Sequence, residues 1–158
     1  MAELILCVGR LKEAYWRDAC AEYLKRLTRY GRPELIEVDD LPEPEHASDA
    51  DRQRIMQKEG EALLKRLRPT DHVVALCIDA PQLTSEGLAE LLKDRDQRGA
   101  RTVFVIGGSL GLSGEVIARA DRRLSMSKMT FPHQLARVML LEQLYRARKS
   151  LAGERYHK

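Results

Sequence analysis

The stretch Val103-Phe104-Val105-Ile106-Gly107-Gly108-Ser109-Leu110-Gly111-Leu112 decides the predicted fold. Its apolar run up to Ile106 is typical of a strand that is buried on both faces, as in a parallel sheet. The glycines that follow expose backbone N–H and C=O groups at the carboxyl edge of the sheet, where open α/β folds bind ligands. The spacing GGxxG differs from the dinucleotide fingerprint GxGxxG, which argues against a nicotinamide dehydrogenase. A plain glycine-rich turn is the alternative for this loop.

Alternating strands and helices extend outward from this stretch in both directions. We predict strands over residues 4–9, 34–38, 72–79, 101–106 and 123–126. We predict helices over residues 16–30, 48–67, 84–98, 115–120 and 132–149, with Ser48, Asp49 or Asp51 as alternative starts of the second. This order predicts an α/β fold, a mostly parallel sheet with helices on both faces. No repeat or linker divides the chain, so we expect a single domain over residues 1–158.

Composition excludes several classes of protein. The chain is 44% hydrophobic and 32% charged, which is typical of a globular domain. It has neither the apolar run of roughly 18 residues that a membrane span requires nor a basic leader, so we expect a cytoplasmic protein. Cys7, Cys20 and Cys77 are odd in number and far apart, so we expect reduced thiols and no metal site.

Positive charge is concentrated at the C-terminal end. From Arg137 onward six Lys and Arg residues face two Glu residues, a net charge of +4. This run favours a nucleic-acid partner, and a solvated helix end is the alternative. Arg137 and Arg146 are nine residues apart on the last predicted helix, and we expect both on one face, where either contacts phosphate. An ion pair with Glu142 at the i,i+4 spacing is the alternative for Arg146.

Two further segments carry residues suited to chemistry. In Leu124-Ser125-Met126-Ser127-Lys128-Met129-Thr130-Phe131-Pro132-His133-Gln134, a polar loop enters a helix opened by proline. Its Met and Phe side chains form either an apolar slot for a heterocycle or ordinary core. The segment Gly153-Glu154-Arg155-Tyr156-His157-Lys158 offers groups that stack on a base, move a proton and meet a phosphate. A polar end without function is the alternative, and we expect this tail to lack order before substrate binds.

Taken together, IGGSxG (106–111), SxSKMTFPHQ (125–134) and GExYHK (153–158) resemble the bacterial rRNA pseudouridine N3-methyltransferases of the SPOUT class. The similarity extends to VGRLKEAYW (8–16), DHVVALCIDA (71–80) and LTSEGLAE (83–90). The resemblance implies a C-terminal α/β trefoil knot that holds S-adenosylmethionine. It also implies a homodimer that acts on the assembled ribosome, at N3 of a pseudouridine in a hairpin loop of 23S rRNA.

The resemblance also implies site residues. The cofactor-binding residues would be Leu76, Gly107, Gly108, Gly111, Met126, Ser127, Lys128, Met129, Thr130 and Phe131. Tyr156 and His157 match the catalytic tail, and Lys158 joins Arg137 and Arg146 as a candidate RNA contact. A uracil-type N3 carries a proton, and His157 is the candidate base, with Tyr156 or Lys158 as alternatives.

The last predicted helix also favours a homodimer, because its apolar band is wider than one sheet contact requires. The band comprises Leu135, Val138, Met139, Leu140, Leu141, Leu144 and Tyr145. Two rival functions stay open. One is a methyltransferase of the same class that acts on another RNA such as tRNA, and the other is a ribosome-binding protein that retains the pocket without turnover.

Overall fold

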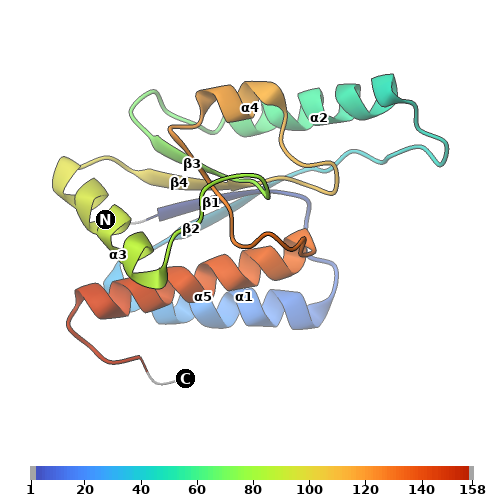
Figure 1. The fold of residues 1–158 in the computed structure, drawn as a ribbon. Coiled ribbons are helices and arrows are strands. Elements are labelled where there is room, and N and C mark those ends of the chain that lie inside the picture. Colours follow the sequence, from blue (N-terminus) through green and yellow to red (C-terminus); the bar gives the residue numbers. More distant parts are fainter. Residues whose placement is uncertain (1–2, 157–158) are drawn as a thin grey trace.

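The computed structural model describes residues 3–156, in which strands and helices alternate along the chain (Figure 1). The strands are β1 (Glu3–Val8), β2 (Glu34–Val38), β3 (His72–Leu76), β4 (Thr102–Ile106) and β5 (Arg122–Leu124). The helices are α1 (Ala14–Leu27), α2 (Asp49–Leu64), α3 (Ser85–Arg98), α4 (Gly114–Arg119) and α5 (His133–Leu151), and a 3₁₀ turn (Thr28–Tyr30) follows α1.

The strands of the described residues form one sheet in the order β2-β1-β4-β3-β5, and every neighbouring pair is parallel. This confirms the predicted parallel sheet. Because the strands are parallel, their carboxyl ends meet at one edge, on the right of Figure 1. The loops that follow β1, β2 and β4 gather there with the start of α5.

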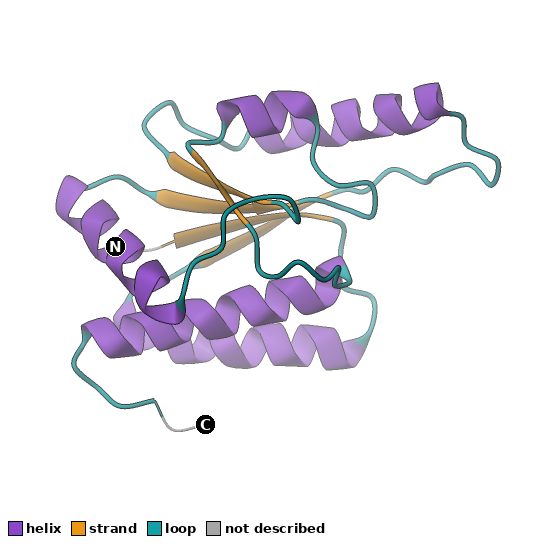
Figure 2. Ribbon diagram, in the orientation of Figure 1, coloured by secondary structure: helices purple, strands orange, loops and turns teal. Residues whose placement is uncertain are grey.

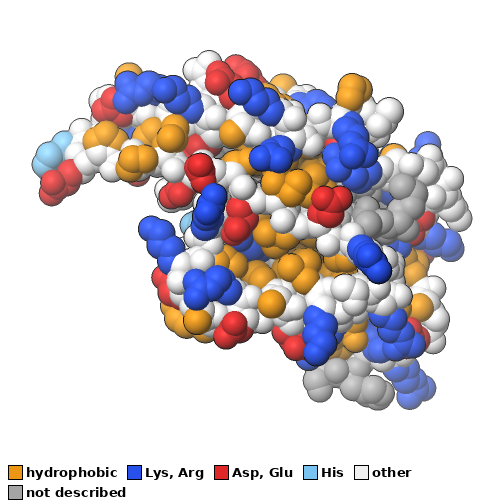
Figure 3. Space-filling model, turned by 180° about the vertical axis from the view of Figure 1, so that it is seen from behind, with side chains coloured by type: hydrophobic (Ala, Val, Ile, Leu, Met, Phe, Trp, Pro, Cys, Tyr) orange, Lys and Arg blue, Asp and Glu red, His pale blue; other side chains and the backbone are white. Residues whose placement is uncertain are grey.

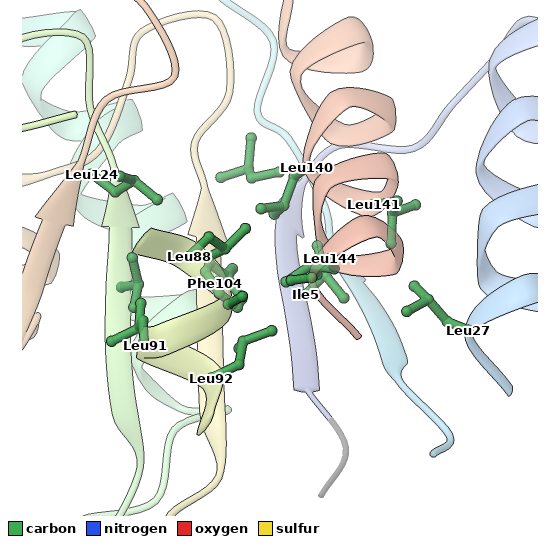
Figure 4. Close-up of a cluster of buried hydrophobic side chains, with 14 of the residues drawn as sticks. Ile5, Leu27, Leu88, Leu91, Leu92, Phe104, Leu124, Leu140, Leu141 and Leu144 are labelled. Atoms are coloured by element: carbon green, nitrogen blue, oxygen red, sulfur yellow. The ribbon is translucent and has the colours of Figure 1, made fainter. Parts of the chain in front are cut away.

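Helices cover both faces of the sheet, as predicted (Figure 2). Side chains alternate along each strand, so Ile5 of β1 belongs to the core beneath α1, α3 and α5, while Leu6 belongs to the core beneath α2 and α4. Figure 4 shows the first core, where Ile5 and Phe104 of the sheet meet Leu144 of α5 and Leu27 of α1. The second core includes Leu63 of α2.

Several element boundaries differ from the prediction. The third strand ends at Leu76 and not at residue 79, because the chain leaves the sheet after the Cys77 N–H donates to the carbonyl of Leu124 over 3.0 Å. Ile78 continues the apolar run in sequence but is 53% exposed. The fifth strand is shifted to residues 122–124. Among the three alternative starts of α2, Ser48 is the N-cap, in a capping box with Asp51.

The segments that follow β3 and β5 lie against each other. The Ser125 N–H donates to the carbonyl of Pro81 over 2.9 Å, and Gln82 forms an isolated parallel bridge with Ser125. In Figure 1 the two segments, green and orange, cross in front of the sheet. The trefoil knot that the resemblance implies is consistent with this crossing. Among residues 3–156, no helix combines the length and apolarity that a membrane span needs.

Candidate functional site

A cavity of about 870 Å³ opens at the carboxyl edge of the sheet. Leu76 and Ile106 contribute the ends of β3 and β4, and the glycine loop and the loop before α5 complete the walls. The predicted cofactor residues that line it are Leu76, Gly107, Gly108, Gly111, Met126, Ser127, Met129, Thr130 and Phe131. Lys128 is exposed and does not contribute to the wall. Segments more than 50 residues apart in sequence therefore meet around one cavity.

The glycine loop folds tightly back on itself. A Cβ atom at Gly107 would lie 2.8 Å from the carbonyl carbon of Gly111 and 2.9 Å from its oxygen, closer than side-chain atoms approach backbone. Gly111 has φ of +86°, and its N–H donates to the carbonyl of Gly108 over 3.0 Å. The loop therefore requires glycine at these positions, and its backbone forms one wall of the cavity.

The loop before α5 is held by hydrogen bonds within it. The hydroxyl of Ser125 donates to the carbonyl of Ser127 over 2.8 Å, and the Met129 N–H donates to the hydroxyl of Ser127 over 3.0 Å. Met126 and Phe131 are partly buried, whereas Met129 is 73% exposed at the mouth. The apolar slot therefore exists as a wall of the cavity and not as closed core.

Arg137 is buried, whereas the predicted phosphate contact would require it to face solvent. Its side chain is 0% exposed, and its guanidinium donates to Glu37 over 2.5 Å and to the carbonyl of Gly9 over 3.1 Å. Nine residues span about two and a half helical turns, so Arg137 and Arg146 lie on opposite faces, and the expectation of one shared face is wrong. Arg137 therefore joins α5 to β2 and to the residue that follows β1. The predicted phosphate contact at Arg137 is wrong, because its guanidinium forms an internal ion pair.

Arg146 forms the ion pair with Glu142 that was the alternative to a phosphate contact. Its guanidinium donates to Glu142 over 2.7 Å, which confirms the i,i+4 pair. It also lies 4.2 Å from the ring centroid of Tyr156. The side chain stays 26% exposed, so an additional RNA contact at Arg146 remains a prediction.

The C-terminal tail is held in place up to Tyr156. Tyr156 packs edge-on against Tyr145, with ring centroids 5.3 Å apart, and Glu154 accepts a hydrogen bond from the Tyr30 hydroxyl over 2.8 Å. The expected lack of order is therefore wrong for these residues. Burial and hydrogen bonds with Glu142 and Tyr23 raise the pKa of Tyr156 to about 12. Tyr156 is not among the residues that line the cavity of its own chain.

His157 and Lys158, the other predicted tail residues, lie outside the described residues.

Ion pairs neutralise much of the basic C-terminal segment. Arg148 pairs with both Glu3 and Asp96, and Lys149 lies 3.6 Å from Glu154. Figure 3 shows basic and acidic side chains interspersed over the face seen from behind. The sequence count of +4 therefore overstates the positive charge that is available to a nucleic acid.

Two residues at the site were missed from sequence. His133, the first residue of α5, lines the cavity, and its Nδ1 atom is buried and lacks a hydrogen-bond partner in the described part of the chain. Glu59 of α2 lines a smaller cavity that adjoins this one, and it is 5% exposed. The signal for Glu59 is its spacing of four residues from both Ile55 and Leu63, which places a carboxylate on the apolar face of the helix.

Comparisons with known proteins agree with this architecture. The family described as "Predicted SPOUT methyltransferase" matches residues 1–157. "Ribosomal RNA large subunit methyltransferase H" of Bifidobacterium animalis subsp. lactis is 56% identical over 155 residues, covering 98% of this chain and 98% of the relative. The protein of the same name from Carboxydothermus hydrogenoformans is 48% identical, with the same coverage of both chains.

A solved structure has the same fold. The crystal structure of a methylase family protein from Neisseria gonorrhoeae superposes with a TM-score of 0.57 at 14% identity, covering 99% of this chain and 86% of that chain. The matched length, the identity of the relatives and the shared fold lead to one conclusion: the chain belongs to the SPOUT methyltransferase family.

Proposed function

We propose that this chain transfers a methyl group from S-adenosylmethionine to large-subunit ribosomal RNA. The observation that carries the proposal is the 56% identity, over nearly the full length, to a relative named as a methyltransferase of that RNA. The motifs at 106–111, 125–134 and 153–158 support a finer proposal, namely N3 of a pseudouridine in a hairpin loop of 23S rRNA, on the assembled ribosome. Such a substrate also supports a cytoplasmic location.

The cavity fits the cofactor in size and chemistry. Its volume of about 870 Å³ lies in the range of small-molecule sites, which is roughly 300–1,000 Å³. Leu76, Ile106 and Met126 offer apolar contacts to a flat ring, and the close-packed glycine loop brings backbone polar groups to the wall. S-adenosylmethionine supplies an activated methyl group on a sulfonium, so the protein contributes mainly alignment of donor and acceptor.

The acceptor nitrogen carries a proton that must leave. Tyr156 is a poor acceptor for this proton, because its raised pKa keeps the phenol protonated at neutral pH. A lysine ammonium is also protonated there, which disfavours Lys158. We therefore assign proton removal to His157, whose imidazole ordinarily titrates near neutrality.

We also propose that the enzyme is a homodimer whose sites are shared between subunits. Three residues of the apolar band are buried in the core of the chain, namely Leu140, Leu141 and Leu144. Val138 and Met139 of the same band are partly exposed, so they are available for contact with a second copy. Tyr156 lies against α5 and does not line the cavity of its own chain, so the tail of the partner subunit complements each cavity.

Methyl transfer with labelled S-adenosylmethionine tests the reaction. The acceptors are intact ribosomes, free large-subunit RNA, ribosomes that lack pseudouridine, and tRNA. We expect label only on intact ribosomes that contain pseudouridine. Label on tRNA would favour the rival RNA substrate, and cofactor binding without label on any acceptor would favour a ribosome-binding protein without turnover.

Complementation tests the shared site. Gly107→Ala damages the cavity and Tyr156→Ala damages the tail, so each variant alone should lose most of its activity at limiting S-adenosylmethionine. In an equal mixture with exchanged subunits, half of the dimers are mixed, and each mixed dimer has one intact site if the tail acts on the partner. Activity should then recover to about one quarter of wild type. No recovery, despite subunit exchange, would show that each chain serves its own cavity.

A further inference from the structure

A smaller cavity of about 160 Å³ adjoins the cofactor cavity. The two share Gly108, Ser109, Leu110 and His133 as common wall, so they are neighbours around the glycine loop. The far wall of the smaller cavity, which we call the acidic niche, contains Asp40 after β2 and Glu59 of α2. A ligand in the cofactor cavity therefore has the niche directly beside it.

Glu59 carries a buried carboxyl group to which no described residue supplies a cation. It is 5% exposed, and one oxygen accepts a hydrogen bond from the Leu41 N–H over 3.0 Å. Within residues 3–156, neither Glu59 nor Asp40 takes part in an ion pair, whereas Glu43 in the same wall is paired with Arg52 at 3.0 Å. Burial, together with the charge of Asp40, raises the pKa of Glu59. An ionised carboxylate in such a place is unfavourable unless it takes up a proton or a ligand supplies the opposite charge.

The neighbouring groups leave the niche open and do not neutralise it. A Cβ atom at Gly108 would lie 3.2 Å from Cγ1 of Val8 and 3.5 Å from Oε1 of Glu59, so glycine keeps the shared wall thin. Burial and the charge of Arg137 lower the pKa of His133, which leaves its imidazole neutral at neutral pH, although Asp40 opposes this shift. The niche therefore presents two carboxyl groups to its occupant, and no residue of the described chain neutralises them with a positive charge.

The two carboxyl groups of the acidic niche determine which class of ligand it can bind. RNA phosphates would be repelled by ionised carboxylates, and a neutral N–H donor gains less from a buried carboxylate than a cation does. In the described part of the chain, no three His, Cys, Asp or Glu side chains are grouped closely enough to hold a metal ion. The cofactor of the proposed function carries one primary ammonium, at the end of its methionyl chain, and this group matches the niche in charge and size.

We propose that Glu59 and Asp40 form a subsite for the α-ammonium group of S-adenosylmethionine, beside the cavity that takes the adenosyl part. This inference rests on the proposed function. Each carboxylate gains the charged donor that it lacks among residues 3–156, and charge-assisted hydrogen bonds of this kind are among the stronger ones. Binding favours ionised Glu59, so it should release a proton, and affinity should fall as pH decreases.

Calorimetric binding to the full chain tests the subsite with three ligands. S-adenosylhomocysteine carries the ammonium, its deamino analogue lacks only that group, and 5′-methylthioadenosine lacks the whole amino-acid end. Wild type should bind S-adenosylhomocysteine at least about tenfold more tightly than the deamino analogue. Glu59→Gln and Asp40→Asn should each weaken S-adenosylhomocysteine by about 10- to 100-fold and leave the other two ligands within about twofold.

Asp39→Asn is the matched control, because Asp39 is next to Asp40 and is exposed as Asp40 is, but it does not line the niche and is paired with Arg10. It should change none of the three affinities. The inference is overturned if Glu59→Gln and Asp40→Asn weaken all three ligands equally, which would indicate a distorted cavity, or weaken none. Failure of wild type to bind even 5′-methylthioadenosine would instead overturn the proposed cofactor site itself.

Discussion

Replacing Arg137 by methionine separates its two interpretations, an RNA contact and an internal ion pair. The substitution retains an apolar stem of similar length and removes the guanidinium that joins α5 to Glu37 and to the carbonyl of Gly9. If Arg137 acts internally, folding stability should fall and the salt dependence of ribosome binding should not change.

The magnitude follows from burial. Removing one partner of a buried ion pair costs about 3–5 kcal/mol, because the other charge is left uncompensated. Glu37 is 29% exposed and regains part of its hydration, so we expect about 2–4 kcal/mol. For a chain of this size, each kcal/mol lowers Tm by roughly 2–4 °C, which gives a decrease of roughly 5–15 °C.

Urea denaturation followed by far-UV circular dichroism measures this change. Arg146→Met is the control on the same helix. Its i,i+4 pair with Glu142 is partly exposed, and the substitution should cost less than about 1 kcal/mol. The reasoning is refuted if Arg137→Met leaves the urea midpoint unchanged and instead reduces the slope of ribosome affinity against salt by about one ion pair.

Three further predictions concern the cavity, a helix start and pH. Gly107→Ala should weaken S-adenosylhomocysteine binding by at least about tenfold in calorimetry, because its Cβ meets backbone, while Gly114→Ala, with open space around it, should change nothing. Ser48→Ala should lower the free energy of unfolding by about 1 kcal/mol in urea, through loss of the α2 cap; an unchanged midpoint contradicts this. Folded Glu59 retains its proton above the ordinary pKa of 4.5, where the unfolded chain releases it, so stability should fall as pH rises through that window. Glu59→Gln should flatten this decrease in unfolding experiments across pH, and an unchanged slope would exclude Glu59 as its source.

Most of the fold was predictable because its signals are local. The apolar run before Gly107 and its counterparts elsewhere indicate strands buried on both faces, and their alternation with helices requires parallel pairing. Pro132 marks the start of α5 to within one residue. The cavity was predictable in outline for the same reason, since loops that follow parallel strands must gather at the carboxyl edge.

Contacts between residues that are distant in sequence could not be predicted from such local signals. The positive charge of Arg137 suggested a phosphate, but Glu37, one hundred residues earlier, neutralises it inside the chain. Tyr156 was expected in a tail that lacks order before substrate binds, and only the packing of α5 reveals Tyr145 as its neighbour. The third strand was predicted too long, because the sequence does not distinguish a buried apolar residue from an exposed one such as Ile78.

The sequence by itself determined the class of fold, the edge of the sheet where the cavity opens and the family motifs, because periodicity, glycine and proline act over a few neighbouring residues. The tertiary structure alone decided which charges are paired. It pairs Arg137 with Glu37, and it buries Glu59 beside the large cavity without an ion pair to any described residue. The physical reason is that hydration and Coulomb attraction depend on burial and on distances across the fold, which no local pattern encodes.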